Sequence, residues 1–185
     1  ETLAAVQSAQ EGWHARWLVR DMKKVVDGRS ETVELWGAAG THGAGPRYKL
    51  TILDGKSAGM SQLVAVFIVP QGKEHEYLFA TEDGLRQIAA SASCARLVVV
   101  TLNSREGHIF GTLEAVQEEL SPAVLDFAPE GNTQKIPFMT TSDSLGNRSI
   151  VARGLLSGGD AYLVEEHEEN DGNLVRRLVF AAHTN

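Results

Sequence analysis

Leu63-Val64-Ala65-Val66-Phe67-Ile68-Val69 is an unbroken apolar run, and Pro70 ends it. A run this short is unsuited to an isolated helix, whereas a strand covered on both faces requires a continuous apolar sequence. A second such run, Leu97 to Leu102, follows after a segment with helical spacing. The order strand, helix, strand predicts a right-handed parallel crossover, with the first run as a central strand of a sheet covered on both faces.

Two helices are predicted to flank this sheet. Thr81 is placed to cap the first, which carries Glu82 and Asp83 in its opening turn and ends near Ser93. The second has the most regular amphipathic spacing of the chain, and Pro129 stands just past its end. The residues expected to face inward are Leu85, Ile88 and Ala89 in the first helix, and Leu113, Val116, Leu120, Val124 and Phe127 in the second.

Upstream of the first apolar run the pattern changes from helix to strand. Thr2 to Asp27 shows helical spacing and predicts one long helix or two, with Gly28 at the C-cap. Further along, the sequence predicts a strand over 32–36, a glycine-rich loop over 37–45, a strand over 48–53 and a turn at Asp54-Gly55.

The C-terminal part is expected to be rich in β-structure. Residues 130–147 are rich in Gly, Ser, Thr, Asn and Pro and read as a linker. Three strands are then predicted over 150–153, 162–166 and 174–180. A two-residue turn at Asp171-Gly172 would place Glu166 opposite Arg177 and Leu163 opposite Phe180.

The predicted fold class is therefore α+β: a mixed sheet with a strand-helix-strand crossover and covering helices, followed by a β-hairpin tail. We expect an α/β domain over 1–129, a linker over 130–149 and a β-rich segment over 150–185. The chain begins with Glu1 rather than a methionine, its first residues already show helical spacing, and it ends right after a predicted strand. We therefore also expect it to be a fragment of a longer protein.

The net charge and the cysteine content limit the classes of partner and the cellular environment that the sequence favours. The formal charge of −7, from 17 Lys and Arg against 24 Asp and Glu, opposes binding to nucleic acid or to an anionic membrane. No apolar stretch reaches the roughly 20 residues that span a bilayer. The single cysteine, Cys94, precedes an apolar run and reads as a buried structural thiol, which favours a cytoplasmic, reducing environment.

No complete nucleotide site is visible in the sequence. Dinucleotide and methyl-donor folds place a glycine-rich turn after the first strand and a carboxylate after a later one. Here Pro70-Gln71-Gly72-Lys73 follows the first buried run and Leu102-Asn103-Ser104 ends the second. The glycine-rich loop at 37–45 lacks the lysine of a P-loop and reads as a flexible connection. We therefore predict no cofactor-binding residue in this chain.

Metal and nucleophile sites are not predicted either. The acidic run Glu165 to Glu169 surrounds His167, but alternate strand residues point to opposite faces, so a solvated hairpin arm is the favoured reading. None of the serines lies in a nucleophile elbow. The remaining residues considered are His14, His42, His75, His108 and His183, which lack metal-site spacing, Ser57, Ser91 and Ser157, and the pair Trp13 and Trp17, which reads as core packing or a partner anchor.

Several blocks of the sequence together carry a family resemblance: Val66 to Gly72, Glu76 to Phe79, Gln87 with Ala89 to Ala92, Arg96-Leu97, Ser157 to Tyr162 and Arg176 to Phe180. They resemble the middle region of the methyltransferase-like protein 13 family, the elongation factor 1-alpha lysine and N-terminal methyltransferases. The resemblance implies a parent with two S-adenosylmethionine-dependent catalytic domains whose cofactor motifs lie outside these residues.

On this resemblance the chain is expected to be a non-catalytic connecting region with no catalytic, cofactor-binding or metal-binding residue of its own. Its expected partners are the flanking methyltransferase domains and elongation factor 1-alpha. Two alternatives remain: an independent protein-interaction module, and an enzyme whose site is assembled from scattered residues. An exposed apolar patch around Trp13 and Trp17 would favour the module, and a pocket with convergent polar groups and perturbed acids would favour the enzyme.

Overall fold

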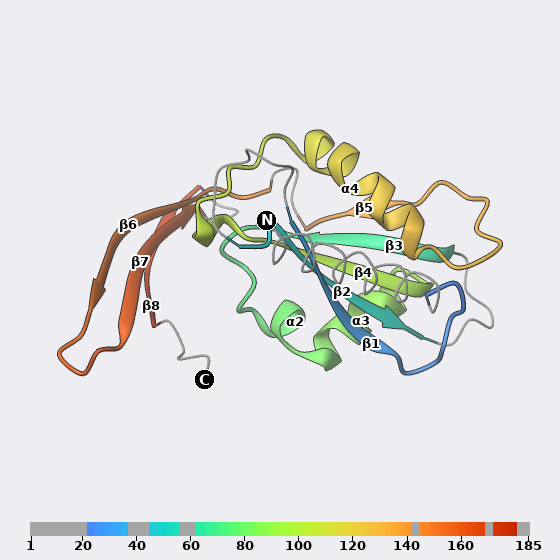
Figure 1. Cartoon of the computed structure of the whole chain (residues 1–185), viewed down its shortest axis with the longest axis horizontal. Helices are drawn as coiled ribbons and strands as arrows, with labels where there is room; N and C mark the ends of the chain where they lie inside the picture. The colour runs from blue at the N-terminus through green and yellow to red at the C-terminus, as the bar shows by residue number, and fades with distance from the viewer. Residues whose placement is uncertain (1–21, 37–44, 56–61, 142–144, 169–171, 181–185) are drawn as a thin grey trace, which may run out of the picture.

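The computed structural model describes residues 22–36, 45–55, 62–141, 145–168 and 172–180. They form a five-stranded mixed sheet with helices on both faces and a three-stranded antiparallel sheet that projects from one end of it (Figure 1). The elements are β1 (Ser30–Leu35), β2 (Tyr48–Asp54), β3 (Gln62–Val69), α2 (Tyr77–Ala80), α3 (Glu82–Ser91), β4 (Cys94–Leu102), η1 (Ser104–Glu106), α4 (Leu113–Phe127), β5 (Phe138–Met139), β6 (Arg148–Leu155), β7 (Ala161–Glu168) and β8 (Leu174–Phe180). The α+β class predicted from the sequence is confirmed.

The five-stranded sheet has the strand order β1-β2-β4-β3-β5. β3 runs parallel to β4 and to β5, whereas β2 is antiparallel to both β1 and β4. The predicted parallel crossover is confirmed, since α3 connects β3 to its parallel neighbour β4. Both apolar runs are interior strands, as their continuous hydrophobicity requires, and β4 occupies the middle of the sheet.

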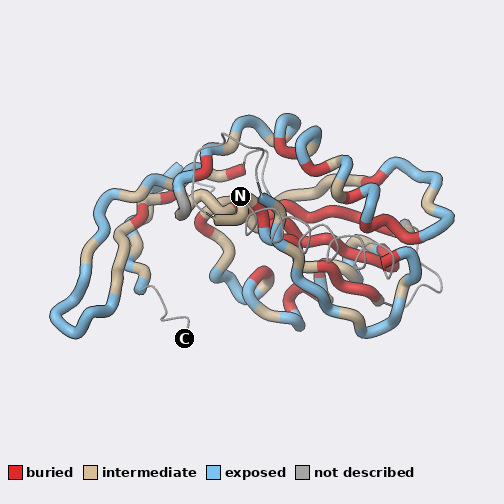
Figure 2. The backbone as a smooth tube through the Cα atoms, viewed as in Figure 1, coloured by how far each residue is buried: buried red, intermediate tan, exposed pale blue. Residues whose placement is uncertain are grey.

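The alternation of side chains along β3 builds one core on each face of the sheet. Val64, Val66 and Ile68 pack with the buried side of α4, which contributes Val116, Leu120, Val124 and Phe127. The intervening Ala65, Phe67 and Val69 pack with Leu85 and Ile88 of α3. Figure 2 shows these strands as the buried layer of the molecule. The inward-facing residues predicted for both helices are thus confirmed, with Ala89 and Leu113 only partly buried.

The helix ends follow the capping residues in the sequence. The Thr81 hydroxyl accepts a hydrogen bond from the Gly84 amide at the start of α3, at 3.1 Å. Thr112 accepts from the Ala115 amide in the same way at the start of α4, at 3.3 Å. Each cap satisfies an amide that has no partner inside its helix.

Two predictions in the N-terminal part are corrected. Residues 22–28 form turns and irregular structure, so the predicted helix does not reach Asp27 and Gly28 caps no helix. The rest of that predicted helix, and most of the loop over 37–45, lie outside the described residues. Asp54 is the last residue of β2 rather than part of a tight turn.

A buried ion pair explains both corrections. The Arg96 Nε and Nη2 atoms lie 2.6 and 2.7 Å from the Asp54 carboxylate oxygens, and both side chains are fully buried. Arg96 also donates to the carbonyl oxygens of Met22, Lys24 and Phe127. These hydrogen bonds hold the segment before β1, as turns, against β4 and the end of α4.

The segment 130–149 contributes to the fold instead of merely connecting two parts of it. It contains β5, whose Phe138 and Met139 pair with β3, and Ile136 and Leu145 are buried in the core beneath α4. The reading of this stretch as a plain linker is wrong at these residues, because its polar composition hid a few apolar positions. The domain boundaries at 129 and 149 stay a prediction.

Strands β6, β7 and β8 form the antiparallel sheet that we call the arm, residues 148–180. The three strands were predicted, but the register of the last hairpin was wrong by one residue. Glu166 lies opposite Arg176, Glu165 opposite Arg177, and Leu163 opposite Val179. Glu168 pairs with Leu174, so five residues, 169–173, separate the two strands. An odd number of intervening residues is incompatible with the predicted two-residue turn at Asp171-Gly172.

Candidate functional site

The carboxyl ends of β3 and β4 are the place where an open α/β sheet normally binds its ligand. β3 has β4 on one side and β5 on the other, and the connecting helices α3 and α4 lie on opposite faces. Such a reversal of strand order opens a crevice outside the strand ends in doubly wound sheets. The loops that follow these two strands therefore form the candidate site.

The arm packs onto this edge of the sheet through Glu165 of β7. The Glu165 carboxylate accepts hydrogen bonds from Arg105 at 3.0 and 3.1 Å and from Arg177, and the Arg148 Nε lies 3.3 Å away. Arg105 belongs to η1, directly after β4, while Arg148 and Arg177 come from β6 and β8. We call Glu165 and these three arginines the junction cluster.

The charge of Glu165 is stabilised within this cluster. Burial raises the pKa of the Glu165 carboxyl, but hydrogen bonds from Arg105 and Arg177 and the positive charge of Arg148 outweigh it and lower the pKa to about 2. Glu165 is therefore ionised at neutral pH although its side chain is fully buried. A buried carboxylate with three guanidinium partners fixes the strands and the loop that carry them.

An ion pair and further hydrogen bonds connect the arm to the loops of the five-stranded sheet, which we call the body. Arg148 forms an ion pair with Glu74 at 2.5 Å and donates to the Ser104 hydroxyl at 3.3 Å. Arg153 donates to the Arg105 carbonyl oxygen at 2.6 Å. Glu74 and Ser104 lie in the loops after β3 and β4, so both loops are bound by side chains of β6.

Gly72, in the loop after β3, lies in close contact with the arm. Its φ is +93°, and a Cβ atom built on it would lie 2.8 Å from the imidazole ring of His167 on β7. Its carbonyl oxygen accepts a hydrogen bond from Arg177 at 3.2 Å, and Arg177 also contacts the His75 ring. The glycine after β3 thus provides room for the arm, where a nucleotide fold would use it to approach a phosphate.

The other side of the crevice, toward β5, is closed as well. The Gln71 amide donates to the Leu145 carbonyl oxygen at 2.7 Å, and its side-chain nitrogen donates to the Gly146 carbonyl oxygen at 3.1 Å. A Cβ on Gly146 would lie 2.8 Å from the Gln71 carbonyl oxygen. The space beside the end of β3 is therefore occupied by chain atoms of the arm on one side and of the segment after β5 on the other.

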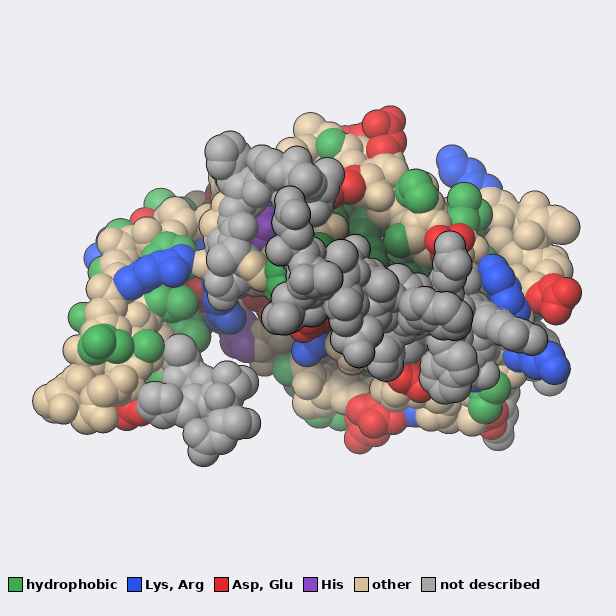
Figure 3. All heavy atoms as spheres, in the orientation of Figure 1, with side chains coloured by type: hydrophobic (Ala, Val, Ile, Leu, Met, Phe, Trp, Pro, Cys, Tyr) green, Lys and Arg blue, Asp and Glu red, His purple; other side chains and the backbone are tan. Residues whose placement is uncertain are grey.

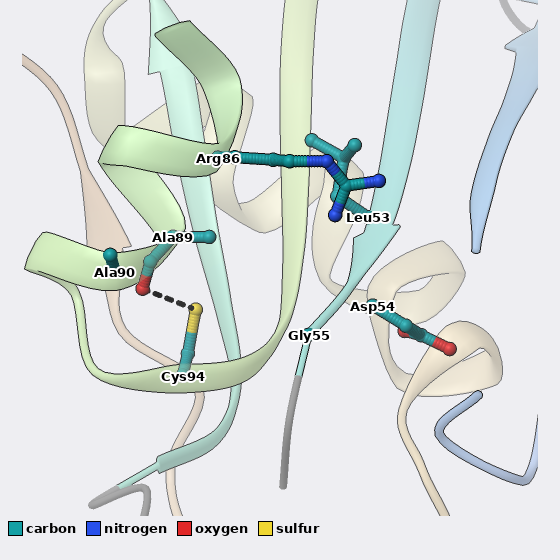
Figure 4. A pocket seen from close by; sticks show the side chains of 7 residues that line it. All are labelled: Leu53, Asp54, Gly55, Arg86, Ala89, Ala90 and Cys94. Atoms are coloured by element: carbon teal, nitrogen blue, oxygen red, sulfur yellow. Dashed lines mark hydrogen bonds between the residues drawn. The ribbon is translucent and has the colours of Figure 1, made fainter. Parts of the chain in front are cut away.

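One pocket lies beside these features and another lies at the opposite edge of the five-stranded sheet. The first, of about 190 Å³, is lined by Glu34, Pro46, Lys49, Glu74, Thr101, Leu102, Asn103, Arg105 and Arg148. Its two arginines already have carboxylate partners. Arg105 forms an ion pair with Glu165, and Arg148 forms ion pairs with Glu74 and Glu165. The other, of about 230 Å³, lies between α3 and the ends of β2 and β4 (Figure 4).

The second pocket offers little chemistry. Figure 4 shows Arg86 crossing it beside Leu53, while the Asp54 carboxylate points away toward Arg96. Cys94 lines the pocket and donates to the Ala89 carbonyl oxygen at 3.8 Å. Burial raises the pKa of its thiol to about 11, so the thiol stays protonated and the predicted buried structural role of Cys94 is confirmed.

The structure agrees with only part of what the sequence predicted for the histidines and the acidic run Glu165 to Glu169. Glu165 and His167 are buried, so the reading of this run as a solvated arm is wrong for both. His108 is also buried and contacts the Gly45 carbonyl oxygen at 3.2 Å, whereas His75 is exposed. Within the described residues, no group of three or more His, Cys, Asp or Glu side chains could hold a metal ion.

Two of the three serines named from the sequence lie in the described part of the chain. Ser91 and Ser157 are exposed at the end of α3 and in the turn before β7. Ser57, Trp13, Trp17, His14, His42 and His183 lie outside the described residues. Across the helices that the structure describes, none is long and apolar enough to cross a membrane.

Sequence reasoning missed the residues that matter most at this junction, namely Arg105, Arg148 and Glu165, and also the pair Arg96 and Asp54. Arg96 carried a usable signal, because it directly precedes the apolar run Leu97 to Leu102, and a charged residue that is buried with such a run needs a partner. The junction cluster carried none, since its members come from three distant segments.

Comparison with known proteins places the chain. It is 41% identical over 140 residues to a Danio rerio protein named eEF1A lysine and N-terminal methyltransferase, a match that covers 73% of this chain and 20% of the relative. Proteins of the same name from Mus musculus and Homo sapiens are 32% and 31% identical over 183 residues, which is 97% of this chain and 26% of each relative. The chain is homologous to part of these methyltransferases.

The chain spans about a fifth to a quarter of the length of these relatives. No family model matches it, and no solved structure does. The homology thus supports the family resemblance read from the sequence, while the position of the matched stretch within the relatives stays a prediction.

Proposed function

We propose that this chain is the non-catalytic middle region of a dual S-adenosylmethionine-dependent protein methyltransferase that acts on elongation factor 1-alpha in the cytoplasm. The cofactor would be bound by the flanking catalytic domains and not by this region. Its role would be to connect the two domains and to hold them at a defined distance and orientation.

The observation that carries this proposal is the filled crevice at the carboxyl ends of β3 and β4. His167 abuts Gly72, and Gln71 is hydrogen-bonded to the segment after β5. A methyl donor needs backbone amides of a glycine-rich turn and a carboxylate for its ribose at this edge. Here the same edge is used to attach the arm.

A connecting region also needs stiffness, and the junction cluster supplies it. Three guanidinium groups surround a single buried carboxylate, and each partner comes from a different element. Charged hydrogen bonds of this kind are directional and therefore define one orientation of the arm relative to the sheet. A scaffold of this design transmits a fixed geometry between the segments on either side.

The proposal is tested by calorimetric titration of the 185-residue chain with S-adenosylmethionine at millimolar concentration. We expect no saturable heat, whereas the full-length protein binds the cofactor in the same buffer. Saturable binding by the chain alone would overturn the proposal and favour the enzyme alternative.

Docking of the substrate is a separate question, because a connecting region need not touch elongation factor 1-alpha. A pull-down with the purified factor and the chain alone addresses it. Retention of the factor would assign this region a docking role in addition to its connecting role. If the chain neither retains elongation factor 1-alpha nor binds the cofactor, only the connecting role remains.

A further inference from the structure

The outer face of the arm is mainly apolar, and none of the elements that the structure describes packs over it. We define it by Tyr162 and Val164 on β7 and Leu174, Leu178 and Phe180 on β8, which the strand pairing places on one side of the sheet. Leu174, Leu178 and Phe180 are 71%, 53% and 58% exposed. Figure 3 shows hydrophobic side chains gathered on the arm. The opposite side carries Glu165, His167 and Arg177, which pack against the body.

This pattern is unusual for a sheet with one face in water. An antiparallel sheet that is solvated on one face normally places polar side chains there, in alternation with apolar ones that face the core. On β8 the outward positions are Leu174, Arg176, Leu178 and Phe180, whereas the inward positions are Val175, Arg177 and Val179. Both faces are therefore mainly apolar, as in a strand that is covered on both sides.

Two charged residues of the outer face, Arg176 and Glu166, pair with each other within the arm. Arg176 donates to Glu166 across the strands, with one of the bonds at 2.9 Å, so the pair presents no net charge to a partner. Tyr162 lies over Gly154 of β6, where a Cβ atom would come within 2.7 Å of its ring. Apart from the exposed Glu168 at the end of β7, what remains for recognition is a mainly apolar surface, and such a surface is suited to an apolar partner.

We propose that the outer face of the arm is the docking surface for a flanking domain of the same polypeptide, which covers it with an apolar patch of its own. This inference rests on the proposed function. Its support is the length of the relatives, about three quarters of which lies outside the matched stretch. A covalently linked domain meets the face at a high effective concentration, so even a modest apolar contact keeps it docked.

The test compares cysteine labelling of a Leu178→Cys variant in the full-length protein and in the 185-residue chain. A maleimide reagent is used, and the extent of labelling is measured by mass spectrometry on the peptide that carries residue 178. Each rate is divided by the rate of the same variant in urea. Leu125→Cys on α4, which replaces a leucine of similar exposure at 59%, is the matched control.

We expect residue 178 to react at least about tenfold more slowly in the full-length protein than in the chain alone, a factor that corresponds to about 1.4 kcal/mol. The slowing should not depend on protein concentration. The buried Cys94 reports folding in the same samples, since it stays unlabelled in folded chain. If position 178 reacts slowly in the isolated chain while Cys94 shows that this chain is folded, the chain covers the face itself. That result would overturn the proposal.

Two other results would also overturn it. Fast labelling of position 178 in the full-length protein would mean that the face is free. Protection that disappears on dilution would mean that a second copy covers the face. None of these readouts requires cofactor or activity, so a free face leaves the non-catalytic role standing, and cofactor binding by the chain leaves the docking result standing.

Discussion

Arg96 is fully buried on β4, where its guanidinium binds the Asp54 carboxylate and three backbone carbonyl oxygens. We expect Asp54→Ala to lower the free energy of unfolding by about 3–5 kcal/mol, because it leaves a buried charge without its partner. Urea denaturation measures this loss. The exposed pair of Arg86 and Glu82 is the control, since Glu82→Ala should cost only about 0.3–0.5 kcal/mol. Equal losses in the two variants would refute the structural role of the buried pair.

Glu165 predicts a dependence of stability on pH. Its pKa is lowered from 4.5 to about 2 in the folded chain, so its stabilising effect is complete above the unfolded pKa and is lost as the pH falls toward 2. The shift corresponds to roughly 3 kcal/mol. We expect Glu165→Gln to be less stable than the wild type at pH 7, and the difference to shrink between about pH 5 and pH 2.

The measurement is urea denaturation of both proteins across this pH range. Protonated glutamic acid resembles glutamine, and this is why the two curves should converge at low pH. A difference that stays constant with pH would show that Glu165 acts through its shape and not through its charge.

Among the elements, α3 depends on a glycine for its packing against α2. A Cβ atom on Gly84 would lie 2.4 Å from the Tyr77 carbonyl oxygen and 2.6 Å from the Leu78 Cα, both backbone atoms. Alanine normally favours a helix over glycine by about 1 kcal/mol. We nevertheless expect Gly84→Ala to destabilise the protein by about 1–3 kcal/mol, because the two short helices must move apart.

Thermal unfolding of Gly84→Ala and Gly111→Ala tests this expectation. A Cβ on Gly111 would meet its nearest neighbour, the Ala115 Cβ, at 3.6 Å, which is an ordinary contact. Gly111→Ala should therefore change the melting temperature little. An increase in stability for Gly84→Ala would mean that α2 does not pack as described.

At the scale of the whole molecule, the contact between Gly72 and His167 joins the arm to the five-stranded sheet. Gly72→Ala should destabilise the chain through its positive φ and through collision with the His167 ring. Gly159 has a similar φ of +89° but nothing within 4 Å of an added Cβ. Gly159→Ala therefore isolates the backbone strain, which is about 1–2 kcal/mol.

We expect Gly72→Ala to cost about 1–3 kcal/mol more than Gly159→Ala, the usual range for overpacking. The additional loss should be smaller in the double variant Gly72→Ala with His167→Ala, which removes the colliding ring. Chemical denaturation of the four proteins gives these differences. Equal losses for the two glycine variants would mean that the arm does not pack against Gly72.

The fold of the five-stranded sheet could largely be read from local patterns. The apolar runs Leu63 to Val69 and Leu97 to Leu102, the caps Thr81 and Thr112 and the spacing of α4 all report burial or hydrogen bonding within one element. Such patterns are visible because periodicity and capping depend on neighbours in the sequence. The resemblance to the elongation factor methyltransferases was likewise available from the residues alone and agrees with the homologues.

The junction between the sheets depended on tertiary structure. Glu165 meets Arg105 and Arg148 across separations of 60 and 17 positions, and no local pattern links them. The hairpin register shifted by one residue, and because side chains alternate with a period of two, that shift turned Glu165 inward and left Glu166 outside. A long-range ion pair is formed only where the folded chain brings its members together, so burial of this charge and closure of the crevice were decided in three dimensions.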